Sequence, residues 1–255
     1  MFDWCVHSCL KIGHITFILP ITVLGMIFHQ RKLYEKAACF LLFAMIFNTL
    51  LKHLFRVPLF PHLGEGYAFP SGHMHAAAMF YGYILYQMVD RRIKMLLAII
   101  LMCEGFSLIY CKFHDLLDVL GALGFAVAEI FCYHLIVSKF KEKGEKYATA
   151  IAIAIALGAM IILSIIYRIE NHVWLAFYGL CGLFFSLSQI ADKKLKTLLQ
   201  KFWALLIASL FCWLVYMVFK NLNFRQNFLF EIKFALLPII VAGSIKYTAS
   251  RFATL

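Results

Sequence analysis

The sequence predicts an all-α membrane protein, a polytopic helix bundle with about nine transmembrane helices. Hydrophobic residues make up 64% of the chain and charged residues only 15%, whereas soluble domains are about half apolar and a quarter charged. The apolar residues gather in segments that are long enough to cross roughly 30 Å of hydrocarbon, which takes about 17–25 residues. Lys and Arg, which give a formal net charge of +11, lie in short clusters between these segments. Such clusters mark membrane topology, and they differ from the basic patch with interleaved aromatic residues that is typical of nucleic-acid binding.

The predicted spans cover most of the chain, and we assign residues 1–255 to a single membrane domain. In chain order the spans are 12–29, 36–55, 72–89, 95–112, 115–137, 147–167, 172–190, 202–219 and 228–247. Pro20 and Pro238 lie inside the first and last spans, where a missing backbone N–H kinks a helix. The unusual polar residues lie within 36–137, which we expect to carry the chemistry, while 147–247 supplies additional helices of plain hydrophobic sequence.

The positions of Lys and Arg predict which ends of the spans face the cytoplasm. Alternate connections hold sixteen basic residues, and the connections on the opposite side hold seven. Because cytoplasmic loops carry the excess, the N-terminus, the loop before residue 72 and the 112–115 junction are expected on the non-cytoplasmic side, with the C-terminus in the cytoplasm. The short loops favour a bacterial inner membrane over an endoplasmic reticulum membrane.

A polar stripe ends the second span and leads to a loop with the features of an anion site. Asn48, Lys52 and Arg56 are spaced four residues apart, so they share one helix face. The Gly- and Pro-containing loop that follows ends in Pro70-Ser71-Gly72-His73, where the third span begins. Ser71 has the chemistry of a helix N-cap, and Gly72 lets backbone amides approach a ligand. Phosphate is the expected anion.

A histidine and a carboxylate stand at the start of the fifth span. His114 and Asp118 are four residues apart, so Asp118 can bond one imidazole nitrogen and leave the other free as a nucleophile or base. Charge counting places this pair and His73 at the same face of the bilayer. No spacing of Cys, His or acidic residues indicates a metal site.

The order of these residues resembles the type 2 phosphatidic acid phosphatase superfamily, which includes lipid phosphate phosphatases, undecaprenyl pyrophosphate phosphatases and glucose-6-phosphatases. The second motif of the superfamily, Pro-Ser-Gly-His, is intact at 70–73. In the third motif, which reads Ser-Arg, five residues, His, three residues and Asp, the residues Ser107, His114 and Asp118 are in register. The resemblance spans about 52–118, within the first half of the chain.

The resemblance implies a metal-independent phosphatase that acts through a phosphohistidine. His114 would attack phosphorus, Asp118 would orient His114, and His73 would protonate the leaving oxygen. Lys52, Ser71 and Gly72 would hold the phosphoryl oxygens. The same groups are what the reaction requires physically, since it needs a nucleophile, an acid and positive charge around three oxygens. The substrate expected is a lipid phosphate or pyrophosphate that enters from the membrane, with a soluble phosphate ester as a further possibility.

The chain departs from the superfamily at both phosphate-binding arginines. Leu59 and Phe60 stand where the first motif has Arg-Pro, and Leu108 stands where the third has Arg. Arg56 lies one turn before Leu59 and Lys112 one turn after Leu108, and we expect these two cations to compensate. Because a lysine offers a point charge in place of a bidentate fork, phosphate recognition is expected to differ from the family pattern.

Three alternatives to phosphatase activity stay open. Sphingomyelin synthases and inositol phosphorylceramide synthases resemble the superfamily while lacking some arginines, so transfer of a phospho-headgroup between lipids is the runner-up. A non-catalytic family member and a polytopic transporter are the others, although clustering of the polar residues at one face disfavours transport.

Two acidic residues at membrane depth are further candidates for a role, because such groups are costly there unless they are paired or functional. Glu104 lies in the fourth span and Glu129 in the fifth, and pairing with a neighbouring helix is the favoured interpretation for Glu129. His75 is expected on a different helix face from His73, in contact with the loop or the substrate.

Overall fold

The computed structural model describes residues 2–167, 169–191, 193–221 and 231–252. All regular structure in these ranges is helical, which confirms the prediction of an all-α fold. The helices are α1 (Phe2–Ile12), α2 (Ile15–Gly25), α3 (Arg31–Phe55), α4 (Gly72–Gln87), α5 (Arg91–Tyr110), α6 (Leu116–Phe140), α7 (Gly144–Ile166), α8 (Asn171–Gln189), α9 (Leu198–Asn221) and α10 (Lys233–Arg251), with short turns η1 (Met26–Gln30), η2 (Pro61–Leu63) and η3 (Lys141–Lys143). Each predicted span contains a helix, although the start of the last one, 228–230, lies outside the described residues. Helix α1 was not predicted.

Four stretches of the described residues are long and apolar enough to cross a membrane: Ile15–Phe55, Arg91–Tyr110, Leu116–Ile166 and Leu198–Lys220. Two of them are 41 and 51 residues long, about twice the ~20 residues that one crossing needs. In the longer one, α6 and α7 pack against each other on either side of η3, so that this stretch is a helical hairpin. The four stretches fit an integral membrane protein, and nine separate crossings stay a prediction.

The other long stretch also changes direction. Gly25, at the end of α2, lies so close to the ring of Tyr34 that an added Cβ would stand 2.3 Å from it. In a straight helix these two positions would be about 13 Å apart along the axis. The chain therefore turns at the π-helical segment η1 between them.

The chain divides into two compact units. The first comprises 1–19 and 40–168, and the second comprises 20–39 and 169–255. Helix α3 belongs to both, because its residues up to Cys39 lie in the second unit and those from Phe40 on lie in the first. Most of residues 36–137, the region that the sequence predicts to carry the chemistry, falls in the first unit.

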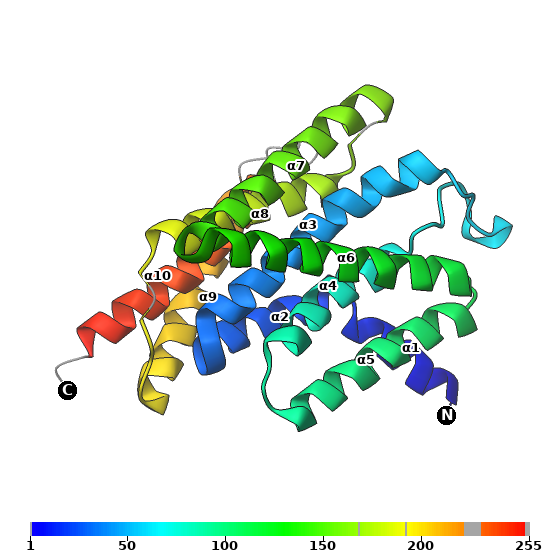
Figure 1. Cartoon of the computed structure of the whole chain (residues 1–255). Coiled ribbons are helices and arrows are strands. Elements are labelled where there is room, and N and C mark those ends of the chain that lie inside the picture. The colour runs from blue at the N-terminus through cyan, green and yellow to red at the C-terminus, as the bar shows by residue number, and fades with distance from the viewer. Residues whose placement is uncertain (1, 168, 192, 222–230, 253–255) are drawn as a thin grey trace. The chain divides into compact units, whose positions relative to one another are not determined.

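Helix α4 is the central helix of the first unit. It packs against both α5 and α6 and lies between them (Figure 1). Its side chains are buried around most of its circumference, as expected for a helix that is apolar on all faces. Helix α1 packs on α5. The core at the centre of the unit consists of Ala44, Met74, Ala78, Met79, Leu108, Val119, Ala122 and Ala126.

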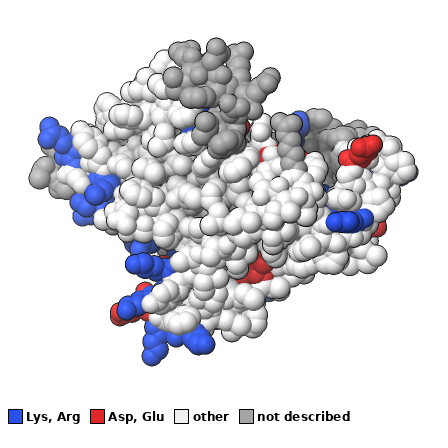
Figure 2. All heavy atoms as spheres, turned by 90° about the horizontal axis from the view of Figure 1, so that it is seen from above, with Lys and Arg blue, Asp and Glu red and all other residues white. Residues whose placement is uncertain are grey.

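The second unit is built on α10, which packs against α8 and α9. Its core combines side chains of η1, α9 and α10: Met26, Ile27, Ala204, Ala208, Val241 and Ile245. Figure 2, which draws the whole chain, shows a largely uncharged surface with Lys and Arg in separate clusters. Such a surface suits contact with lipid tails.

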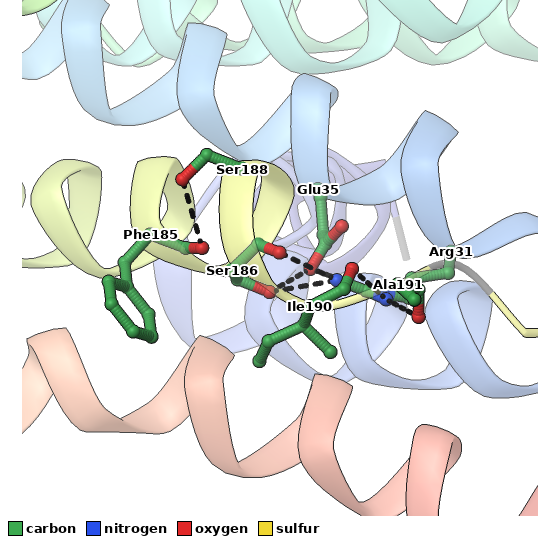
Figure 3. A network of polar contacts seen from close by, with 7 residues as sticks. All are labelled: Arg31, Glu35, Phe185, Ser186, Ser188, Ile190 and Ala191. Carbon is green, nitrogen blue, oxygen red and sulfur yellow. Dashed lines mark hydrogen bonds and ion pairs between the residues drawn. The ribbon is translucent and has the colours of Figure 1, made fainter.

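A buried ion pair closes one end of α8 in the second unit (Figure 3). Charge counting treats Arg31 as a topology residue in a loop, but its side chain is only 3% exposed. The Arg31 guanidinium donates to the backbone carbonyls of Ser186, Ile190 and Ala191, and its Nε lies 3.1 Å from Glu35 Oε1. Ser186 Oγ donates to the same carboxylate oxygen. Arg31 thus provides a donor for the carbonyls of Ile190 and Ala191 at the end of α8, and a second donor for the Ser186 carbonyl, which also accepts the N–H of Ile190.

Replacing Gly182 by alanine is expected to destabilise the second unit. Gly182 brings α8 against the backbone of α10, and an added Cβ would stand 2.1 Å from the carbonyl oxygen of Ala235. Since backbone atoms cannot rotate away, the two helices must separate, at a cost of about 1–3 kcal/mol. The matched control is Gly158→Ala in α7, where nothing lies within 4 Å of the added methyl group. Thermal unfolding in detergent micelles measures both, and equal midpoints for the two variants would contradict the predicted close packing.

Candidate active site

The start of α6 holds His114 and Asp118 in a fixed arrangement. Asp115 is the N-cap of the helix, and its side chain accepts the backbone N–H of Asp118 at 2.8 Å. Asp118 Oδ2 in turn accepts the N–H of Asp115 at 3.2 Å and lies 3.1 Å from Nδ1 of His114. His114 and Asp118 are both buried. A carboxylate beside Nδ1 favours the tautomer with its proton there, which leaves the Nε2 lone pair of His114 available.

The Pro70-Ser71-Gly72-His73 segment is bonded directly to this helix start. Ser71 is the N-cap of α4, its hydroxyl accepts the N–H of Met74, and its own N–H donates to the carbonyl of Asp118 at 3.1 Å. Phe69 packs on Gly121 of α6, where an added Cβ would stand 2.2 Å from the ring. The Pro70-Ser71-Gly72-His73 segment and the start of α6, which are more than forty residues apart in sequence, therefore meet at one place.

His73 points from the first turn of α4 toward other basic groups. Its ring is stacked with that of His14 at a centroid distance of 6.2 Å. It also lies close enough to His114 and Lys52 for the charges of these groups to act on it. Three imidazoles and one ammonium group thus gather near the N-terminus of α4, an arrangement that favours an anion.

Lys52 belongs to this cluster through its position on the last turn of α3. Its Nζ donates to the carbonyl of Tyr67 at 2.8 Å, and its Cε would lie 4.0 Å from a Cβ added at Gly72. The half-buried side chain therefore reaches from α3 to the loop and to the first residue of α4. Tyr67 is held by the pairing of Pro58 with Tyr67 across the loop.

His114 lies in the short connection between α5 and α6, and its surroundings change the pKa of its ring. Burial lowers the pKa of the His114 ring below its ordinary value. The hydrogen bond to Asp118 opposes this effect by raising the pKa, and the charge of Lys52 lowers it again. The net result is a ring with a lowered pKa, which is neutral at neutral pH and retains a nucleophilic lone pair.

Arg56 and Lys112, the two cations expected to compensate for the missing arginines, occupy equivalent places at helix ends. Each follows the last residues of its helix with a positive φ of 54°, and each side chain is exposed. Arg56 Nε donates to the carbonyl of His53 at 3.1 Å. Leu108, which stands in the place of the family arginine, is buried in the core of the first unit. Compensation by Arg56 and Lys112 stays a hypothesis.

Three residues beside the motif side chains take part in the arrangement. No role was predicted for His14 from the sequence. The only feature that could have indicated one is its position as a polar residue between Ile12 and Ile15, at the edge of an apolar segment. Asn48 donates from Nδ2 to the carbonyl of Pro70 at 3.2 Å. His75 is fully buried and contacts Asn48 and Glu129, where contact with the loop or substrate was expected. The pairing of Glu129 with a neighbouring helix agrees with its favoured interpretation.

Glu104, the other acidic residue at membrane depth, is buried in α5 beside the chain turn that follows α1. A Cβ added at Gly13 would stand 2.4 Å from its carboxylate. Within the described residues, no group of three or more His, Cys, Asp or Glu side chains is arranged to hold a metal ion.

Comparisons with known proteins do not assign a function to these residues. No family model matches the chain, and no curated protein or solved structure matches it either. The site must therefore be interpreted from its own chemistry.

Proposed function

We propose that the chain is a membrane phosphatase that hydrolyses a lipid phosphate or pyrophosphate monoester through a phosphohistidine. The observation that carries the proposal is the bond from the Ser71 N–H to the Asp118 carbonyl, because it joins the anion-binding helix start to the nucleophile and its carboxylate. The likeness to the type 2 phosphatidic acid phosphatase superfamily supports the same function through the motifs at 70–73 and 107–118.

The proposed reaction has two steps, and His114, His73 and Asp118 take part in both. Nε2 of His114 attacks phosphorus, the bond from phosphorus to the ester oxygen breaks, and His73 gives its proton to the departing oxygen. Water then attacks the phosphohistidine, His73 takes a proton from that water, and the bond from Nε2 to phosphorus breaks to release phosphate. Asp118 keeps the Nδ1 proton of His114 in place and stabilises the positive ring during both steps.

The phosphoryl oxygens need donors that are fixed before the substrate arrives. Lys52 supplies a positive charge, and the backbone amides at the start of α4, beginning with Gly72, supply N–H groups that a helix leaves unpaired. We place the site at the non-cytoplasmic face of a bacterial inner membrane, with the N-terminus on that side and the C-terminus in the cytoplasm. The catalytic groups then lie near the lipid headgroups, and the apolar tail of the substrate stays in the membrane.

Headgroup transfer between lipids is the second candidate, and one observation favours it. Leu108 occupies the position of a family arginine and is buried among apolar side chains, so that position contributes no cation. A phosphodiester carries less negative charge than a phosphomonoester and needs fewer cations. In the transferase, the hydroxyl of a second lipid would replace water in the second step.

A panel of substrates tests the proposal. Purified protein in detergent is given lipid monophosphates, an isoprenoid pyrophosphate and sugar phosphates, and inorganic phosphate is measured. Release from the lipid substrates is the expected result. Headgroup exchange without phosphate release would replace the phosphatase by the transferase, and no turnover of either kind would contradict both.

The pH profile of kcat/KM provides a further prediction. His114 must be unprotonated to attack, and burial together with Lys52 lowers its pKa. On the acidic side, activity should therefore rise with pH below about pH 6.5, the ordinary pKa of histidine. Because His73 must hold a proton to give to the departing oxygen, activity should fall again at higher pH, where His73 is unprotonated. In Lys52→Met the positive charge is gone, the pKa of His114 rises, and the acidic limb should move to higher pH. An unchanged limb in this variant would show that Lys52 does not act on His114.

A further inference from the structure

A line of buried polar side chains runs beneath the Pro70-Ser71-Gly72-His73 segment. It joins three helices: Asn48 comes from α3, His75 from α4 and Glu129 from α6. Asn48 Nδ2 lies 3.2 Å from the carbonyl oxygen of Pro70 and 3.3 Å from Nδ1 of His75. Nε2 of His75 lies 3.2 Å from Oε1 of Glu129, at ion-pair distance but off the line of a hydrogen bond. None of these three residues has a role in the reaction proposed above.

The hydrogen positions along this line follow from one fixed acceptor. A backbone carbonyl can only accept, so the side of the Asn48 amide that faces Pro70 must be its NH₂ group. The same nitrogen faces Nδ1 of His75, which must then present its lone pair. His75 therefore carries its proton on Nε2, toward the acceptor oxygens of Glu129. Asn48 then donates one amide hydrogen to the Pro70 carbonyl and the other to Nδ1 of His75. The donor and the acceptor of both hydrogen bonds are thereby assigned.

Burial makes this arrangement costly to disturb. Asn48 is 4% exposed and His75 is fully buried, while the Glu129 side chain is 14% exposed. A buried polar group that loses its partner destabilises the fold, and the cost grows for groups at membrane depth. The Asn48 side chain also supports the segment from below, because a Cβ on Gly72 would stand 3.2 Å from its Oδ1.

We propose that Asn48, His75 and Glu129 are positioning residues that hold the Pro70-Ser71-Gly72-His73 segment against the His114–Asp118 pair. The segment is fixed from the α6 side by the bond between Ser71 and Asp118 and from the α3 side by the bond between Asn48 and Pro70. His75 and Glu129 set the orientation of the Asn48 amide. This inference rests on the proposed function, and it adds residues that the sequence motifs do not contain.

The variant Asn48→Asp tests the inference with almost no change of shape. Its carboxylate presents oxygen to the Pro70 carbonyl, so the two groups repel and the segment shifts. A misplacement of about 1 Å can cost ~10²-fold in rate, and we expect kcat to fall by about 10–100-fold with little change in KM. The control is Asn171→Asp, an exposed position at the start of α8 in the second unit, which should retain the activity of the native protein.

Two further readouts separate positioning from a general loss of stability. As the pH falls, the carboxyl of N48D becomes protonated and again donates to Pro70, so its activity relative to the native protein should recover in part. Glu129→Gln keeps an acceptor oxygen facing Nε2 of His75 and should stay within about threefold of native activity, whereas Glu129→Leu should lose activity as N48D does. Thermal unfolding of each variant at the same pH shows whether the fold itself is affected.

The outcomes also distinguish the positioning role from the proposed phosphatase activity. Native-like kcat in N48D, or a ratio of activities that does not change with pH, would overturn the positioning role while leaving the phosphatase intact. Binding of orthovanadate, measured as a rise in unfolding temperature, gives a readout without turnover: native protein should bind it, and N48D should bind it more weakly. If the native protein neither releases phosphate nor binds vanadate, the proposed function fails, and the positioning role falls with it.

Discussion

Replacing His114 by alanine is expected to lower kcat/KM for phosphate release by at least about 10³-fold, because the variant lacks the nitrogen that attacks phosphorus. Phosphate binding should be weakened much less, since Lys52 and the amides at the start of α4 are still present. His114 is buried beside Asp118 at 3.1 Å, so the variant leaves a small cavity and a carboxylate that keeps only its bond from the Asp115 N–H. The measurement is phosphate release from the best substrate of the panel, with the amount of folded protein taken from size-exclusion chromatography.

Two comparisons make this test specific. His172→Ala removes an exposed histidine of α8, whose ring pairs with Glu170 on the surface, and it should retain native activity. Asp118→Asn keeps the shape of the site but no longer stabilises the positive ring, so its activity should also fall by several orders of magnitude. If His114→Ala retained more than a tenth of native activity, His114 would not be the nucleophile.

Replacing Arg31 by methionine is expected to be the most destabilising single change in the second unit. The variant leaves the carboxylate of Glu35 buried at 0% exposure without the opposite charge of Arg31, and it removes the Arg31 bonds to the carbonyls of Ser186, Ile190 and Ala191. Removing one partner of a buried ion pair costs about 3–5 kcal/mol, because the remaining charge is uncompensated. Chemical or thermal unfolding in micelles measures the loss.

The matched control for this change is Arg91→Met, which removes an exposed arginine at the start of α5 and should alter stability by less than about 0.5 kcal/mol. The double variant Arg31→Met/Glu35→Gln removes the uncompensated charge as well, and it should recover part of the lost stability. Equal stability of Arg31→Met and Arg91→Met would show that the buried network contributes nothing to the fold.

The helices were largely predictable because a membrane environment leaves long apolar segments in the sequence. The predicted span 115–137 corresponds to α6 (Leu116–Phe140), and 172–190 corresponds to α8 (Asn171–Gln189). The spacing of His114 and Asp118 also indicated their contact, since residues four apart lie on one helix face. These features depend on local sequence alone.

What the sequence did not reveal depends on contacts between distant segments. In the sequence, Arg31 belongs to a basic cluster of the kind that marks membrane topology. Its burial depends on the C-terminus of α8, which is more than 150 residues away. Similarly, Asn48 was recognised as part of a polar stripe, but its bond to Pro70 requires the packing of α3 against the start of α4. Helix α1 is an 11-residue helix that is too short to stand out as a span, and its packing on α5 brings the following residue His14 toward His73.

The central claim is that His73, His114 and Lys52 surround one phosphoryl group, and an experimental structure with bound orthovanadate tests it most directly. We expect vanadium at bonding distance from Nε2 of His114, with His73 on the opposite side of the ion and the oxygens near Lys52 and the amide of Gly72. Vanadate bound elsewhere, or rings of His73 and His114 too far apart to contact one ion, would contradict the account.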